Sequence, residues 1–203
     1  MSYPKKIFYK DLILYVDENV YHPAEDTYLL AENLNVKKND VVLDVGTGCG
    51  IIALLSAKKA KEVVAIDINP YAVKCAKKNA KLNNLSDKIE FIIGDLFQPL
   101  RKKEKFTKIF FNAPYLPVEN EKKDNWIEYT WKGGVTGRKV IGAFIADVYY
   151  YLRKGGKVIL VQSTLSSVER TLQDFKKMEF SARIAASSKF MFETIVLIEA
   201  VKK

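Results

Sequence analysis

The chain has few residues with which to bind a metal ion or form disulfides. It contains two cysteines, Cys49 and Cys75, and a single histidine, His22. The cysteines are too few and too far apart for a zinc site or a disulfide framework, and His22 adds no metal partner. We therefore expect no metal site, interpret both cysteines as small packing residues and assign His22 no role.

Long hydrophobic runs, linkers and low-complexity segments are also missing. Charged residues interrupt the apolar positions of residues 1–21, so this stretch resembles neither a signal peptide nor a membrane anchor. We expect a cytoplasmic protein with no membrane association. With 203 residues, 48% of them hydrophobic, the chain is predicted to form one domain, residues 1–203, that buries about 70% of its unfolded surface.

Acidic residues are outnumbered by basic ones, 24 to 33, which gives a formal net charge of +9. Such an excess favours an acidic partner such as RNA, DNA or a ribosome-associated protein. The lysines are scattered, however, and no aromatic residues alternate with them, so the solvated surface of a heat-adapted protein explains the charge equally well. Charge alone leaves the substrate open.

Short apolar runs alternate with segments of helical periodicity. Strands are predicted at 41–45, 63–67, 89–93 and 108–112, with helices over 50–60 and 71–84 between the first three. This βαβαβ order is typical of a parallel sheet with right-handed crossovers. Further along, we expect a helix over about 138–152, a strand at 157–162, a helix near 166–178, and a closing strand pair at 181–188 and 192–200.

Three glycines follow the first strand in the stretch LDVGTGCGI. Gly46, Gly48 and Gly50 let the backbone approach a ligand, and the N-terminus of the next helix favours an anion, so a ligand-binding loop is favoured over a plain tight turn. Ile51 stands where the dinucleotide fingerprint requires a glycine. The spacing therefore argues against a nicotinamide cofactor.

Acidic residues stand at the carboxyl ends of three successive strands. Asp67, about twenty residues beyond the glycines, can accept hydrogen bonds from both ribose hydroxyls, although a helix cap is the alternative. Asp95 can accept an exocyclic amine or be an ordinary turn residue. Together with Asp44, these carboxylates form a crevice suited to a nucleoside that carries a cationic group.

The fourth strand ends in IFFNAPYLP, residues 109–117. Proline cannot donate to a sheet ladder, so Pro114 and Pro117 stop the strand and place Asn112 at its tip. By itself this is a turn after a strand. The neighbouring crevice makes a catalytic role the favoured interpretation.

Four motifs, VLDVGTGCG, AIDINP, GDLF and NAPY, resemble in order and spacing those of the S-adenosylmethionine-dependent methyltransferases of the Rossmann-like class. Within that class the chain is similar to the short archaeal and eukaryotic branch of the HemK-like glutamine methyltransferases, which modify class I peptide-release factors. VYHPAEDTYLL and WKGGVTGRKVI match that branch too, and the likeness covers about residues 20–200.

The resemblance implies an α/β, Rossmann-like methyltransferase fold: a mostly parallel seven-stranded sheet with helices on both faces and a C-terminal antiparallel strand pair. It also implies that residues 1–35 form an N-terminal extension and a helix that close the site. The N-terminal helical substrate domain of the larger bacterial members is expected to be absent.

The cofactor implied by the resemblance is S-adenosyl-L-methionine, with S-adenosyl-L-homocysteine as product. The implied cofactor-binding residues are Thr27, Asp44, Gly46, Gly48, Gly50, Asp67, Ile68, Asp95, Leu96 and Asn112. The implied catalytic residues are Asn112, Ala113, Pro114 and Tyr115.

Asn112 and its successor are expected to hold a planar NH2 group. If the Asn112 carboxamide oxygen accepts one N–H and the Ala113 carbonyl the other, the nitrogen lone pair has to face the methyl group. The usual family tetrapeptide is Asn-Pro-Pro-Tyr. Because the second residue acts through its carbonyl, alanine there affects the rate rather than the activity itself. Tyr115 either packs beside the target group or is a rim aromatic.

Two neighbouring segments keep open roles. The long loop 116–137, with Trp126, Tyr129 and Trp131, is either a substrate clamp or a partner surface. Arg138 either pairs with a substrate carbonyl or stabilises the loop.

Three functions compete. The first hypothesis is methylation of the glutamine side chain in the Gly-Gly-Gln loop of a class I peptide-release factor. The alternative is an adenine-N6 methyltransferase acting on RNA or DNA, since an exocyclic amine presents the same two hydrogens. A cofactor-binding scaffold without catalysis ranks last, because Asn112 and Tyr115 are both present. The resemblance adds a small zinc-binding activator subunit as a partner.

Overall fold

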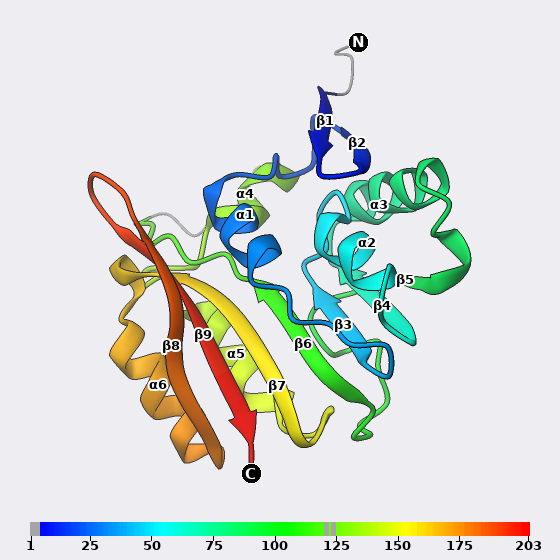
Figure 1. Ribbon diagram of the computed structural model, residues 1–203. Helices are drawn as coiled ribbons and strands as arrows, with labels where there is room; N and C mark the ends of the chain where they lie inside the picture. Colours follow the sequence, from blue (N-terminus) through cyan, green and yellow to red (C-terminus); the bar gives the residue numbers. More distant parts are fainter. Residues whose placement is uncertain (1–4, 120–121, 123–124) are drawn as a thin grey trace.

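The computed structural model describes residues 5–119, 122 and 125–203. Across these residues, seven strands form one sheet in the order β5-β4-β3-β6-β7-β9-β8 (Figure 1). They are β3 (Val41–Val45), β4 (Glu62–Asp67), β5 (Ile89–Ile93), β6 (Phe106–Asn112), β7 (Leu152–Ser163), β8 (Phe180–Lys189) and β9 (Thr194–Lys202). Strands β5, β4, β3, β6 and β7 run parallel to one another, and β9 runs antiparallel to both β7 and β8. The predicted seven-stranded sheet with its antiparallel pair is confirmed.

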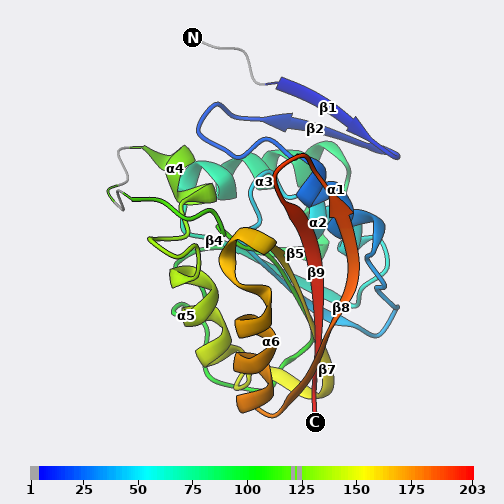
Figure 2. The same cartoon turned by 90° about the vertical axis from the view of Figure 1, so that its left-hand side faces the viewer.

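Helices cover both faces of this sheet. The described residues form α1 (Glu25–Glu32), α2 (Ile51–Ala57), α3 (Pro70–Leu82), α4 (Trp126–Trp131), α5 (Lys139–Val148) and α6 (Val168–Lys177), with the short 3-10 helices η1 (Ser86–Lys88) and η2 (Thr164–Ser166). Helices α1, α2 and α3 pack into the core on one face, and α5 and α6 into the core on the other (Figure 2).

The central strands supply both cores. In β6, Phe110 packs toward α1, α2 and α3, while its neighbours Ile109 and Phe111 pack toward α5 and α6. All five residues of β3 are buried, as expected for a parallel strand covered on both faces. The strand ends that carry the predicted site are therefore fixed by a rigid sheet.

Two element boundaries differ from the predicted ones. Helix α5 ends at Val148 rather than near 152, because Leu152 already pairs with Phe106 in the sheet. Strand β7 accordingly begins at Leu152 instead of 157, with a break in register before Lys157 that contains Gly155 in the left-handed conformation.

An N-terminal hairpin of β1 (Lys5–Tyr9) and β2 (Leu12–Val16) was not predicted. Asn79 of α3 and Asn83, the C-cap residue of this helix, hold the hairpin in place. The Asn79 amide accepts from the Tyr15 N–H and donates to the Tyr15 carbonyl, both at 2.9 Å. Asn83 makes the same pair with Ile13, at 3.1 and 2.8 Å. Two carboxamides one helical turn apart thus make the backbone hydrogen bonds to β2 that a neighbouring strand would otherwise make. Residues 1–4 of the predicted extension lie outside the described residues.

The predicted loop 116–137 contains the short helix α4. The Asn125 side chain caps this helix by accepting from the Glu128 N–H at 3.1 Å, and Leu116 forms an isolated bridge with Lys132. Positions 120, 121, 123 and 124 of this loop lie outside the described residues. Within the described ranges, no helix is long and apolar enough to cross a bilayer, and no cluster of histidine, cysteine and acidic side chains could hold a metal ion.

Candidate active site

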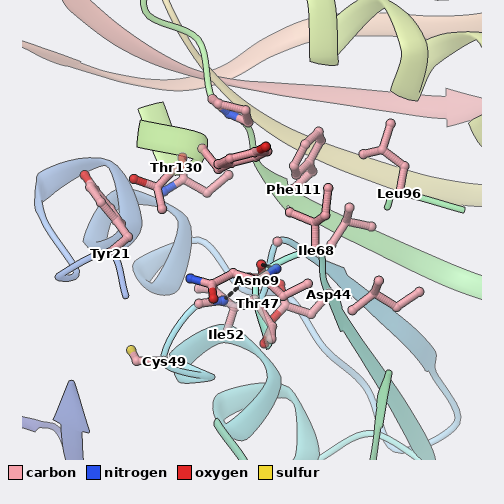
Figure 3. A pocket seen from close by; sticks show the side chains of 18 of the residues that line it. Tyr21, Asp44, Thr47, Cys49, Ile52, Ile68, Asn69, Leu96, Phe111 and Thr130 are labelled. Carbon is pink, nitrogen blue, oxygen red and sulfur yellow. Dashed lines mark hydrogen bonds between the residues drawn. The ribbon is translucent and has the colours of Figure 1, made fainter. Parts of the chain in front are cut away.

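A cavity of about 260 Å³ opens at the carboxyl ends of β3, β4 and β6. Every residue implied to bind a cofactor lines it except Gly50: Thr27, Asp44, Gly46, Gly48, Asp67, Ile68, Asp95, Leu96 and Asn112. Ile68, Leu96 and Phe111 form an apolar wall, and Tyr21 and Thr130 face it (Figure 3). Of the four predicted catalytic residues, Asn112 and Pro114 line the cavity, whereas Ala113 and Tyr115 do not. Ala113 is buried in the core.

The glycines that follow β3 serve different structural purposes. Gly48 has a positive φ of 56°, and a Cβ on it would meet nothing within 4 Å, so its backbone faces open space in the cavity. Gly50 has a φ of 91°, and a Cβ there would lie 2.9 Å from the Ala76 Cβ of α3. Gly50 therefore serves the packing of α2 against α3 rather than the cavity.

Asp44 organises the glycine loop. Its carboxylate accepts from the Thr47 hydroxyl at 2.7 Å and from the Ala53 N–H at 3.1 Å. The side chain is buried, and desolvation raises the pKa of Asp44 to about 7, with the nearby charge of Asp67 adding to the shift. The Asp44 carboxylate thus connects β3, the loop and the first turn of α2.

The two other predicted acids face the cavity more openly. Asp67 accepts from the Gly48 N–H at 2.8 Å and the Asn69 N–H at 2.9 Å, and desolvation raises its pKa to about 6. Asp95 is exposed and accepts from the Gln98 side chain at 3.3 Å. Asn69 caps α3 by accepting from the Tyr71 N–H, so Asp67 is not needed for the alternative role of a helix cap.

Asn112 shows an asymmetry between the two ends of its carboxamide. Its Nδ2 donates to Asp26 Oδ2 at 3.1 Å and to Thr27 Oγ1 at 3.2 Å. Its Oδ1 is buried and has no hydrogen-bond partner among the described residues. A buried acceptor without a partner at a cavity wall is able to receive a hydrogen bond from a ligand N–H.

Asp26, on α1, is the residue of this site that sequence reasoning missed. The sequence shows it only as an acid in the first turn of a helix, where it complements the helix dipole. The structure buries it, and its carboxylate accepts from the Tyr21 and Tyr115 hydroxyls as well as from Asn112. Its position directly before Thr27 in HPAEDTYLL was the available signal.

Comparison with known proteins shows to which family the chain belongs. Residues 19–129, more than half of the chain, match the family described as Methyltransferase small domain. The chain belongs to this family. The predicted resemblance to S-adenosylmethionine-dependent methyltransferases is confirmed, and the chain is an enzyme of the methyltransferase class.

Relatives within this methyltransferase family cover nearly the whole chain. A Methanocaldococcus jannaschii protein provisionally named protein N5-glutamine methyltransferase is 45% identical over 183 residues, 89% of this chain and 91% of that protein. Human methyltransferase HEMK2 is 31% identical over 91% of this chain and 90% of its own length. The release factor glutamine methyltransferase of Dictyoglomus turgidum is 34% identical over 75% of this chain and 57% of the bacterial enzyme.

Solved structures of methyltransferases share the fold. A chain of the E. cuniculi Mtq2-Trm112 complex, described as responsible for methylation of the eRF1 translation termination factor, superimposes with a TM-score of 0.71 at 25% identity, over 91% of this chain and 99% of that one. The ribosomal protein L11 methylase of Lactobacillus delbrueckii shows the same fold, with a TM-score of 0.66 at 23% identity over 93% of this chain and 84% of its own. The predicted Rossmann-like methyltransferase fold is confirmed.

Membership in this methyltransferase family implies S-adenosylmethionine as methyl donor, and the residues present fit such a group. The open space at Gly48 accommodates a ligand against the backbone. Asp67 and Asp95 line the cavity with acceptors that would suit ribose hydroxyls and an exocyclic amine, and the apolar wall would suit an adenine ring.

Arg138 lies away from the methyltransferase cavity. It is buried, and its guanidinium donates to the Ser166 and Ser167 carbonyls at 3.0 and 2.9 Å and to the Asp174 carboxylate at 2.9 Å. Of the two roles left open, this geometry supports the structural one, because the guanidinium joins the start of α5 to η2 and α6. Both cysteines are buried in the core, as predicted.

Proposed function

We propose that this chain transfers a methyl group from S-adenosylmethionine to the side-chain amide nitrogen of the glutamine in the Gly-Gly-Gln loop of a class I peptide-release factor. The observation that carries the proposal is Asn112 Oδ1 at the cavity wall, which has no hydrogen-bond partner in the part of the chain that the structure describes. The names of the relatives in the methyltransferase family support the same substrate.

The chemical difficulty is that an amide nitrogen is a poor nucleophile, because its lone pair is delocalised into the carbonyl group. Asn112 Oδ1 accepts one N–H of the substrate amide, and the Ala113 carbonyl accepts the other. Both hydrogens then point away from the methyl donor, and the lone pair faces it. Such alignment contributes up to roughly 7–11 kcal/mol of barrier lowering. The two acceptors also stabilise the positive charge that develops on the nitrogen.

The methyl donor, when bound, supplies a carbon activated by a sulfonium leaving group. The substrate nitrogen forms the new N–C bond as the S–C bond breaks, and the amide proton leaves to water. Asp67 and Asp95 would hold the nucleoside, and the absence of a side chain at Gly48 would let it approach the backbone. Pro114 biases Ala113 toward extended backbone, so its carbonyl keeps its direction although alanine replaces the usual proline.

A labelled-cofactor assay with three acceptors tests this proposal. Release factor, release factor with its loop glutamine changed to alanine, and RNA or DNA are incubated separately with the enzyme and its activator subunit. We expect label on the unmodified release factor alone. Label on nucleic acid alone would favour the adenine-N6 alternative, and cofactor binding without label anywhere would favour the scaffold.

We also propose that a small activator subunit docks on the edge of the sheet at β5. In the described part of the chain, β5 pairs only with β4, and its last residue, Ile93, is 58% exposed. Leu82, at the end of the neighbouring α3, is 45% exposed. An unpaired strand with an adjacent apolar surface can take up a partner protein by strand addition.

A further inference from the structure

The Asp26 carboxylate is surrounded by hydrogen-bond donors. It is 6% exposed and forms no ion pair among the described residues. Oδ1 accepts from the Thr27 N–H at 2.5 Å and the Thr27 hydroxyl at 3.1 Å. Oδ2 accepts from Asn112 Nδ2 at 3.1 Å and the Tyr115 hydroxyl at 3.2 Å, and the Tyr21 hydroxyl reaches both oxygens at 3.1 Å. A buried charge with this many neutral donors around it is stabilised without a counter-ion.

This arrangement determines which end of the Asn112 carboxamide faces the cavity. An ionised carboxylate has no proton to donate, so only the NH2 end of Asn112 can face Asp26. Thr27 strengthens the preference, since its hydroxyl donates to Asp26 and thereby leaves its oxygen to accept the second N–H of Asn112. Both donors of the NH2 group are satisfied, and within the described ranges Oδ1 is the end left without a partner.

The orientation matters because a flipped carboxamide would present donors to the substrate. The N–H groups of a substrate amide would then meet N–H groups of Asn112, and the methyl-accepting nitrogen would not be held. Asp26 also fixes Tyr115, the last residue of the tetrapeptide, through its hydroxyl. One carboxylate on α1 therefore orients two of the residues assigned to catalysis.

We infer that Asp26 is a positioning residue for the methyl transfer: by accepting from Asn112 Nδ2 it keeps the carboxamide oxygen directed at the substrate amide. The inference rests on the proposed function, because it assigns a direction to the acceptor which that function uses. It also gives the N-terminal segment a defined task, since Asp26 and Thr27 reach Asn112 across 86 and 85 residues of sequence.

A reciprocal exchange of the two side chains tests the inference. Asn112→Asp places a carboxylate against the Asp26 carboxylate, and at pH 8 we expect turnover to fall at least about 30-fold through repulsion. Adding Asp26→Asn to that variant replaces the repulsion with an amide that donates toward position 112, and leaves a carboxylate oxygen facing the substrate. We expect the double variant to be at least about tenfold more active than Asn112→Asp alone. Double-variant activity at or below that of Asn112→Asp would overturn the inference.

A second measurement needs no turnover. The Asn112 side-chain NH2 resonances, assigned by their loss in Asn112→Ala, are expected to exchange slowly with solvent in the wild type and at least about tenfold faster in Asp26→Ala. Unchanged exchange would contradict the inference even if the release-factor assay is positive. If the wild type methylates no release factor, the proposed function fails while the exchange result still decides the role of Asp26. Glu25→Gln, at the exposed neighbouring position of α1, is the control and should alter neither readout.

Discussion

At the scale of single residues, the polar atoms of the cavity divide into those that build it and those left for a ligand. Asp44 accepts hydrogen bonds from Thr47 in the glycine loop and from Ala53 at the start of α2. Asn112 Oδ1 has no partner among the described residues. The sequence predicted which residues gather here, because strand ends and glycine spacing fix their positions. It could not predict the carboxamide direction, which depends on Asp26, a residue 86 positions away.

Truncating the predicted acceptor should separate binding from chemistry. We expect Asn112→Ala to lower turnover at least about a hundredfold, because it removes the acceptor that orients the substrate nitrogen. Cofactor affinity, measured by calorimetry, should stay within about threefold of the wild type, since the cavity keeps its acidic residues and apolar wall. A parallel loss of affinity and turnover would mean that Asn112 mainly holds the cofactor.

The raised pKa of Asp67, about 6, predicts that cofactor binding depends on pH. In the proposed role, the ionised Asp67 carboxylate accepts from the ribose hydroxyls, so binding below pH 6 would require Asp67 to lose its proton. Affinity should therefore rise as the pH increases from 5 to 6 and level off above 7. Calorimetry on Asp67→Asn should give weaker binding without this rise. An identical pH profile in the variant would assign the effect to another group.

At the scale of elements, the strands of the sheet could be predicted from the sequence, whereas the helices and the hairpin packed around it could be predicted only in part. Apolar runs located β3 and β5 at the observed residues. In β3 the cause is burial on both faces of the sheet, whereas β5, an edge strand that is only partly buried, was found from its four apolar residues. The β1–β2 hairpin escaped prediction because its partner is a pair of side chains on α3, not a strand. Helix α4 was not predicted, because a segment of six residues rich in aromatic side chains is equally compatible with a loop.

Asn79 should contribute strongly to stability. It is 1% exposed and bonds to Tyr15 of β2 and to the Cys49 carbonyl at 2.8 Å. Asn79→Ala removes the hydrogen bonds to the Tyr15 N–H and to the Cys49 carbonyl, while the Tyr15 carbonyl keeps the Cys75 thiol as a donor, so we expect a loss of about 3 kcal/mol in the free energy of unfolding. Urea denaturation measures it, with Lys81→Ala, exposed on the same helix, as the control. A loss of stability equal to that of the control would contradict the inference that Asn79 anchors the β1–β2 hairpin.

At the scale of the whole molecule, motif order carried more information than charge. The order of the glycine loop, the acids and NAPY identified the family, which the match to residues 19–129 confirms. The net charge of +9 is compatible with either a protein or a nucleic-acid substrate. Partner surfaces stayed beyond sequence reasoning, because the exposed side of a strand becomes visible only when its neighbours in the sheet are known.

If the activator subunit docks on β5, the two edge strands of the sheet, β5 and β8, should respond differently to substitution. We expect Ile93→Asp on β5 to abolish co-purification with the activator subunit, because a charge in an apolar interface is costly to desolvate. Ile184→Asp is the matched control, since Ile184 is 46% exposed on β8, the opposite edge strand. Equal loss from both substitutions, or retained binding by Ile93→Asp, would place the partner elsewhere.

The most direct test of the central claim is a crystal structure of the enzyme with S-adenosylhomocysteine and a Gly-Gly-Gln peptide whose glutamine carries the N5-methyl group. We expect the methylated nitrogen to donate its remaining hydrogen to Asn112 Oδ1 or to the Ala113 carbonyl, with a donor–acceptor distance of about 3 Å. A product amide bound away from both oxygens, or Asn112 turned so that its NH2 faces the peptide, would contradict the claim.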